Sequence, residues 1–374
     1  MTSKVKQIHD FGQSIWLDFI DRKVILSGEL KKLIEEDGVR GVTSNPAIFE
    51  KAISSSTDYD ADIADLSKGD KTNEQIFFAL AVEDIRQACD LLSNVYNEEE
   101  VVGADGYVSL EVSPFLAEDT HATIDQAREL WKAVGKDNVM IKIPGTESGL
   151  ISIRTAISEG ININVTLLFS LDRYEAVAEA YISGLEERVA NNLPVDRVSS
   201  VASFFLSRID ILVDPLLDQN GLGELKGEVA IASAKLAYQI YKRVFSTDRW
   251  KRLAEKGAVP QRLLWASTSN KNPAFKDTRY VEALIGPDTV NTIPLETLEA
   301  YRDHGTPASR LEDNLETAEG IMERIDDAGI DMGAVTKQLE EEGIEKFIVP
   351  FRKLLDAIGK QKDDAKKFFG TSPI

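Results

Sequence analysis

The sequence predicts an α/β fold with one (β/α)8 TIM barrel, because eight short apolar segments alternate with longer amphipathic ones. Their nearly continuous apolar character is typical of parallel strands that are buried on both faces. The eight segments span residues 14–19, 38–44, 107–112, 138–144, 163–169, 197–206, 262–268 and 288–294. An open, doubly wound sheet is the alternative, but no GxGxxG motif follows an early segment.

Helical patterns occupy the stretches between these segments and continue beyond the last of them. They cover residues 73–95, 121–135, 149–159, 171–190, 224–247 and 311–326. Two connections, 45–106 and 207–261, are long enough to hold additional helices. No linker, repeat or low-complexity segment divides the chain. Residues 1–374 are therefore predicted to form a single domain, with a C-terminal helical extension over about 311–374.

The charge of the chain excludes several classes of partner. Its 374 residues include 63 acidic and 43 basic side chains, which gives a formal net charge of −20. Such a field repels nucleic acid and anionic membranes, so we expect neither as a partner. It also opposes a phosphorylated substrate, and any phosphate site must therefore be locally cationic.

Residues that commonly hold metals are sparse in the sequence. The single cysteine, Cys89, cannot form an intrachain disulfide and lies in a helical pattern typical of packing. The three histidines, His9, His121 and His304, have no ligand spacing, so we expect no metal or other cofactor. The absence of a signal-peptide pattern, and of an apolar run near ~20 residues, predicts a cytoplasmic protein.

Polar residues in or just after the apolar segments are the candidates for a functional site. In barrels of this type the active site lies at the C-terminal ends of the strands. The candidates are Asp18, Thr43, Ser44, Asn45, Glu111, Lys142, Asn164, Thr166, Ser203, Arg208, Ser267, Thr268, Ser269 and Asn270. Asn164 and Thr166 are two positions apart, so they share one face of their strand.

Lys142 is the most informative candidate, because it interrupts the otherwise apolar stretch NVMIKIP. Lysine is almost never fully buried unless it is paired. Burial disfavours the charged form of an amine, and an uncharged amine attacks carbonyl groups to form a Schiff base. A structural alternative stays open, in which Lys142 pairs with a buried carboxylate such as Glu111.

Four other candidates have residue types suited to this chemistry. Glu111 and Asp18 can transfer protons, one of them through a bound water, or can form structural ion pairs. Asn164 and Thr166 can orient that water and substrate hydroxyls, or can simply fill the strand ends. The sequence leaves both interpretations open for each residue.

Arg208 follows the sixth segment and has the donor geometry to bind phosphate through two parallel hydrogen bonds. Ser203 and the backbone amides of a helix start would add donors, in a region where barrels often bind phosphate. The structural alternative is a surface salt bridge between Arg208 and Asp210 or another acid.

Five motifs that contain these candidates resemble motifs of transaldolases. They are GVTSNPAIFEKAI, VSLEVSP, IKIPGT, NVTLLFS and SFFLSR, in the order in which that family has them. The resemblance covers about residues 11–300 and is nearest to the longer bacterial form. It implies a (β/α)8 barrel that needs no cofactor, takes sugar phosphates as substrates, and is a monomer or homodimer.

The resemblance also implies a role for each matching position. Lys142 corresponds to the Schiff-base lysine, Glu111 to the acid/base carboxylate, and Thr166 to the second anchor of the catalytic water. Asp18 corresponds to the carboxylate that takes the proton during C–C cleavage. The implied substrate-binding residues are Asn45, Asn164, Ser203, Phe205, Arg208 and Lys271.

Three of these positions depart from the pattern or have another interpretation. Many transaldolases have a second phosphate-binding arginine where this chain has Ser269, and Lys271 is the nearest replacement for its charge. The motif around Asp18 is altered as well. Phe205 suits core packing as well as substrate contact.

The implied function is transfer of a dihydroxyacetone unit from sedoheptulose 7-phosphate or fructose 6-phosphate to an aldose phosphate, in the pentose phosphate pathway. One rival is a fructose-6-phosphate aldolase-type enzyme, which would release dihydroxyacetone instead; Glu111 favours transfer. The other rival is a non-catalytic barrel that binds sugar phosphates, which the joint presence of Asp18, Glu111, Lys142 and Thr166 disfavours.

Overall fold

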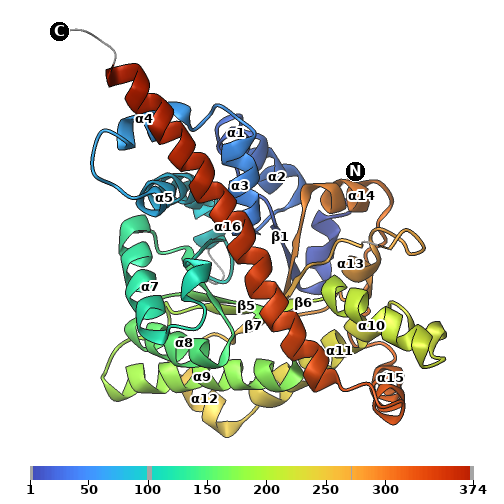
Figure 1. The fold of residues 1–374 in the computed structure, drawn as a ribbon. Coiled ribbons are helices and arrows are strands. Elements are labelled where there is room, and N and C mark those ends of the chain that lie inside the picture. The colour runs from blue at the N-terminus through green and yellow to red at the C-terminus, as the bar shows by residue number, and fades with distance from the viewer. Residues whose placement is uncertain (1–2, 99–102, 271, 371–374) are drawn as a thin grey trace.

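The computed structural model describes residues 3–98, 103–270 and 272–370. Eight parallel strands form one closed barrel in the order β1 to β8, and helices surround it (Figure 1). The predicted (β/α)8 barrel is confirmed. The strands are β1 Gln13–Leu17, β2 Gly41–Val42, β3 Tyr107–Glu111, β4 Val139–Pro144, β5 Ile163–Leu168, β6 Ser200–Phe205, β7 Arg262–Ala266 and β8 Thr289–Ile293.

Seven strands lie within their predicted segments, and β1 begins one residue before its segment, at Gln13. The barrel closes where β1 pairs with β8, with Leu17 opposite Ile293. The shortest strand is β2, whose Gly41 approaches the ring of Trp16 closely. A Cβ atom at position 41 would lie 2.5 Å from that ring, so only glycine fits there.

Helices fill both long connections and follow the later strands. Before β3 they are η1 Lys6–Phe11, α1 Arg22–Leu26, α2 Glu29–Asp37, α3 Pro46–Ser54, α4 Asp60–Leu66, α5 Asn73–Leu91 and α6 Ser93–Tyr96. Between β3 and β6 they are η2 Pro114–Leu116, α7 Thr120–Val134, α8 Glu147–Glu159 and α9 Leu171–Ala190. After β6 they are α10 Ser207–Gln219, η3 Gly223–Leu225, α11 Val229–Val244, α12 Asp248–Ala254, α13 Arg279–Ala283, α14 Leu295–His304, α15 Leu315–Asp327 and α16 Met332–Gly370.

Several helices begin where the sequence supplies a capping side chain. Asp119, Thr146 and Ser170 precede α7, α8 and α9, and each accepts a hydrogen bond from a backbone amide in the first turn. The helical pattern over 224–247 corresponds mainly to α11, which begins at Val229 after the short η3 that ends at Leu225.

A buried polar network closes the N-terminal end of the barrel. Asp105 accepts hydrogen bonds from Ser14 and from Trp16 Nε1, the latter at 2.7 Å. Arg40 Nε lies 3.2 Å from the same carboxylate, and Arg262 Nη2 lies 3.5 Å from it. These residues fill the floor of the barrel, so the cavity is at the opposite end.

The long helix α16 crosses the C-terminal ends of the strands (Figure 1). It packs against α3, α4 and α5 on one side of the barrel and against α10 on the other. Pro350 lies inside this helix, and because proline has no N–H it cannot bond the carbonyl of Lys346. Among the described residues no helix combines the length and the apolar character that spanning a bilayer requires.

Candidate active site

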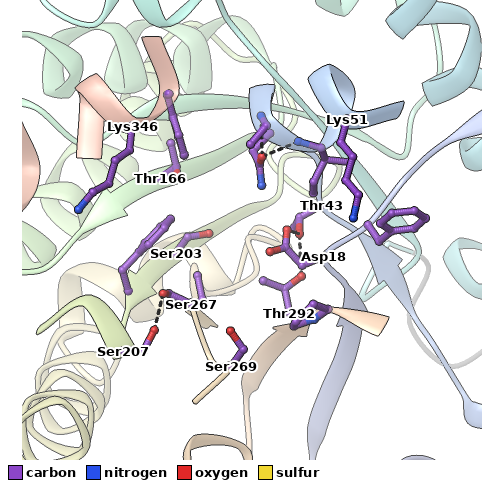
Figure 2. A pocket seen from close by; sticks show the side chains of 18 of the residues that line it. Asp18, Thr43, Lys51, Thr166, Ser203, Ser207, Ser267, Ser269, Thr292 and Lys346 are labelled. Atoms are coloured by element: carbon purple, nitrogen blue, oxygen red, sulfur yellow. Dashed lines mark hydrogen bonds between the residues drawn. The ribbon is translucent and has the colours of Figure 1, made fainter. Parts of the chain in front are cut away.

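A cavity of about 700 Å³ opens at the C-terminal ends of the strands, next to α16. Figure 2 shows side chains from the barrel and from α3 and α16 around it. Of the ten residues to which the resemblance gives a role, seven line the cavity. They are Asp18, Asn45, Lys142, Thr166, Ser203, Phe205 and Arg208.

Lys142 extends from β4 and is 5% exposed. Its Nζ donates a hydrogen bond to the Ser44 carbonyl at 2.8 Å and lies 3.4 Å from Glu111 Oε2. Glu111 and Lys142 are direct neighbours in the register of β3 and β4, which places the two side chains together. The amine is thus held in a nearly dry site, beside a carboxylate and at the edge of the cavity.

Glu111 is 6% exposed, so its carboxyl group is almost completely removed from water. Burial raises the pKa of Glu111 to about 7, although the nearby charge of Lys142 opposes that rise. Neither carboxylate oxygen of Glu111 has a hydrogen-bond partner among the described residues. A carboxyl group that titrates near neutral pH can both accept and return a proton.

Thr166 provides a second polar group beside this pair. Its Oγ1 atom is buried and has no hydrogen-bond partner within the described part of the chain. The register between β5 and β6 shifts between Val165 and Leu168, and Leu167 has a positive φ of 61°. Such irregularities re-aim side chains and often occur next to active sites. Thr166 therefore points its hydroxyl into the cavity from a distorted strand end.

Asp18 lies just after β1, on the other side of Lys142 from β5. Burial raises the pKa of Asp18, whereas Lys142 and a hydrogen bond from Thr43 Oγ1 at 2.8 Å lower it. Thr43 in turn lies 2.7 Å from the hydroxyl of Thr292 on β8. The carboxylate is therefore held in one orientation at the cavity wall.

The predicted amide residues occupy two different settings. Asn164 donates to Ser109 Oγ at 3.0 Å and accepts from Ser203 Oγ at 2.7 Å, so it links β3, β5 and β6 inside the barrel. Asn45 caps α3, and its Oδ1 accepts from the amides of Ala47 and Ile48. Asn45 lines the cavity directly. Asn164 does not, but its amide accepts a hydrogen bond from the hydroxyl of Ser203, which does line the cavity.

Arg208 lies at the start of α10, immediately after β6. Its guanidinium carbon is 5.2 Å from the centre of the Phe205 ring, and its buried Nη1 has no partner among the described residues. Burial lowers the pKa of Arg208, while Asp18, Glu111 and Glu342 oppose that change. Phe205 also packs against Phe169, so it has both a core contact and a cavity contact.

The alternative in which Arg208 pairs with Asp210 is wrong. Asp210 instead accepts a hydrogen bond from Tyr280 at 2.7 Å and another from the Ala230 amide at 2.8 Å. Burial raises the pKa of Asp210 to about 6. Arg208 is therefore left facing the cavity and Glu342. Of the remaining predicted positions, Ser269 lines the cavity and Lys271 lies outside the described residues.

The sequence analysis missed three residues of α16 at this site. Lys346 and Phe347 line the cavity, and the ring centre of Phe347 is 5.9 Å from Lys142 Nζ. Glu342 lies one turn earlier and interacts electrostatically with Arg208. A search confined to strand ends cannot find them, because they lie in the helical extension. Lys51, on α3, also lines the cavity.

Comparisons with known proteins agree with this geometry. The family described as Transaldolase/Fructose-6-phosphate aldolase matches residues 15–358. A transaldolase of Trichodesmium erythraeum is 50% identical, covering 96% of this chain and 97% of its own length. Transaldolase 2 of a Nostoc species is 48% identical, over 95% and 97%. A transaldolase of an Arthrobacter species is 46% identical, over 98% and 100%.

Proposed function

Because the chain belongs to the transaldolase/fructose-6-phosphate aldolase family, we propose that it is a transaldolase whose Lys142 carries a dihydroxyacetone unit between sugar phosphates. The donor would be fructose 6-phosphate or sedoheptulose 7-phosphate, and the acceptor an aldose phosphate. The observation that carries this proposal is the nearly dry amine of Lys142, 3.4 Å from Glu111 at the edge of a large cavity.

The first step is formation of a Schiff base. The neutral amine of Lys142 attacks the C2 carbonyl of the donor and forms a carbinolamine, which loses its hydroxyl group as water. Glu111 supplies and removes the protons, because its pKa of about 7 suits exchange near neutral pH. The unpartnered hydroxyl of Thr166 and the Glu111 carboxyl suit the two ends of a water that relays these protons.

The second step breaks the C3–C4 bond. Asp18 accepts the proton of the C4 hydroxyl, and the aldose phosphate leaves as that oxygen becomes a carbonyl. The bonding electrons move into the protonated imine and give an enamine on Lys142. An acceptor aldose then enters, the enamine carbon attacks its carbonyl, and Asp18 returns the proton. The imine is the electron acceptor during cleavage, and the enamine is the nucleophile during transfer. Water then hydrolyses the regenerated imine, which releases the new ketose phosphate and the amine of Lys142.

The remaining site residues hold the substrate in this scheme. Asn45 and Asn164 bind the hydroxyl groups of the dihydroxyacetone unit, while Ser203 and Arg208 bind the phosphate. Phe205 limits the space beside that phosphate. Lys271, which follows β7 in the sequence, is the proposed source of further positive charge.

We further propose a cytoplasmic protein whose barrel and C-terminal helices act as one domain, as a monomer or homodimer. The packing of α16 against helices α3, α4, α5 and α10 supports the single domain.

Borohydride trapping tests the proposal directly. The protein is incubated with fructose 6-phosphate, reduced with borohydride and digested, and the modified lysine is located by mass spectrometry. The adduct is expected on Lys142. Lys235 is the internal control, because it is 8% exposed but its Nζ donates to the carbonyl of Arg310 at 3.0 Å, outside the cavity. An adduct on another lysine, or none, would contradict the assignment.

The aldolase-type activity is the second candidate, and the family description names both reactions. The two differ in the fate of the enamine. A transaldolase keeps it until an acceptor aldose arrives, whereas an aldolase protonates it and releases dihydroxyacetone. Transfer predicts dihydroxyacetone release without acceptor that is at least about 100-fold slower than turnover with erythrose 4-phosphate, about 3 kcal/mol in barrier height. Equal rates would favour the aldolase.

A further inference from the structure

Two lysines that the proposed function does not use also line the cavity. They are Lys51 on α3 and Lys346 on α16. In Figure 2, Lys346 lies toward the side of Ser203 and Ser207, while Lys51 lies on the side of Asp18. Since Arg208 follows β6 on the Ser203 side, Lys346 is the lysine placed to act together with Arg208.

The acid Glu342 interacts with both of these cations, Arg208 and Lys346. Glu342 interacts electrostatically with Arg208, and its Oε2 lies 3.0 Å from Lys346 Nζ. Its other oxygen, Oε1, accepts a hydrogen bond from Gln338 at 2.8 Å. Arg208 and Lys346 both line the cavity, so Glu342 is an anion paired with one cavity cation and influenced by the other.

This arrangement provides the local positive charge that the composition demands. A sugar phosphate carries nearly two negative charges, and the chain as a whole carries −20. Arg208 alone cannot neutralise such a group, and Asp18, Glu111 and Glu342 are acids that already interact with its charge. A phosphate bound between Arg208 and Lys346 would have a cation on each side, and it would compete with Glu342 for both.

We propose that Lys346 binds the phosphate group of the substrate together with Arg208, and that Glu342 is the counter-ion which this phosphate displaces. The inference rests on the proposed function, whose substrates are sugar phosphates. It makes α16 a determinant of specificity, because one phosphate then bridges the barrel and the helix that crosses it. Phe347, the next residue, has its ring centre 5.9 Å from Lys142 Nζ.

The test compares four variants with the wild type. Lys346→Met removes the charge, Lys346→Arg keeps it, and Glu342→Gln removes the competing anion. Lys353→Met is the matched control, because Lys353 is an exposed lysine of the same helix that does not line the cavity. For each variant, kcat and KM are measured with fructose 6-phosphate, together with the inhibition constant of inorganic phosphate.

Opposite effects of the two partners would support phosphate binding. Lys346→Met should raise KM and the inhibition constant of phosphate about 5- to 20-fold, since it removes one half-exposed charged contact. Glu342→Gln should lower both about 2- to 5-fold. Lys346→Arg should stay within about 3-fold of the wild type, and Lys353→Met should not differ from it. If Lys346 and Glu342 formed only a structural ion pair, Lys346→Met and Glu342→Gln would change KM and the phosphate inhibition constant in the same direction. That result would overturn the proposal.

A phosphate-free readout separates this inference from the proposed function. Borohydride trapping with dihydroxyacetone depends on Lys142 but not on a phosphate contact, so Lys346→Met should form this adduct at the wild-type rate. If the wild type forms no adduct on Lys142, the proposed function fails and the inference fails with it. If the adduct forms normally but Lys346→Met keeps wild-type KM and phosphate inhibition, only the inference is overturned.

Discussion

Replacing Lys142 with methionine should make the protein progressively less stable at alkaline pH. Glu111 is buried 3.4 Å from Lys142 Nζ, and burial raises the pKa of Glu111 from its ordinary value of 4.5 to about 7. The carboxylate is therefore less favourable in the folded state than in the unfolded state. The protonated carboxyl group of Glu111 therefore contributes stability that is fully present below pH 4.5 and is lost as the pH rises through the folded pKa of Glu111.

The size of the effect follows from these two pKa values. In the wild type the loss from Glu111 is nearly complete by about pH 8 and amounts to about 3 kcal/mol. Lys142 is the main group that opposes the rise in the pKa of Glu111, so its removal raises that pKa further. In the variant the loss continues above pH 7 at up to about 1.4 kcal/mol per pH unit. The difference from the wild type should therefore grow by up to about 3 kcal/mol between pH 7 and pH 9.

Urea unfolding of both proteins at pH 6, 7, 8 and 9 measures this difference, and groups common to both cancel. The double variant Lys142→Met/Glu111→Gln is the control and should lose most of the added pH dependence. A small remainder is expected from Asp18, whose pKa Lys142 also lowers. If the wild type and Lys142→Met differ in unfolding free energy by the same amount at pH 6 and at pH 9, Lys142 does not lower the pKa of Glu111, and the reasoning is refuted.

Two further variants probe the floor and the strand end of the barrel. Gly41→Ala should lower the free energy of unfolding in urea by about 2–4 kcal/mol, because its Cβ would lie 2.5 Å from the buried ring of Trp16. Gly320→Ala is the control, because a Cβ there would have nothing within 4 Å. If the two variants were equally stable, the steric argument would be refuted. Thr166→Val should lower kcat and the rate of Schiff-base trapping about 10- to 100-fold with little change in stability, while Thr166→Ser should recover most of the rate. A valine variant with the wild-type trapping rate would remove Thr166 from the proton relay.

The barrel was predictable because each strand is a short apolar segment whose register brings strand ends together. Lys142 and Glu111 stand out as charged residues within apolar stretches, and the pairing of β3 with β4 then makes them neighbours. The length of β2 was not predictable, since it depends on how Trp16 packs against Gly41.

The contribution of α16 was not predictable from local pattern either. Phe347 lies near Lys142 although the two residues are 205 positions apart in the sequence. The amphipathic pattern of 311–374 does not indicate which turn of the helix lies at the cavity. The alternative in which Arg208 pairs with Asp210 failed for a similar reason. Tyr280 comes from α13, far along the chain, and its hydroxyl engages Asp210.

The position of α16 in the chain has a consequence for biosynthesis. All eight strands leave the ribosome before residue 332, so the ring of strands can close while its reactive end is still uncovered. Until the final helix arrives, Lys142 would meet cellular aldehydes and ketones without Phe347 above it. The order of synthesis therefore allows the barrel that holds Lys142 to form before α16, with Phe347, can cover this residue.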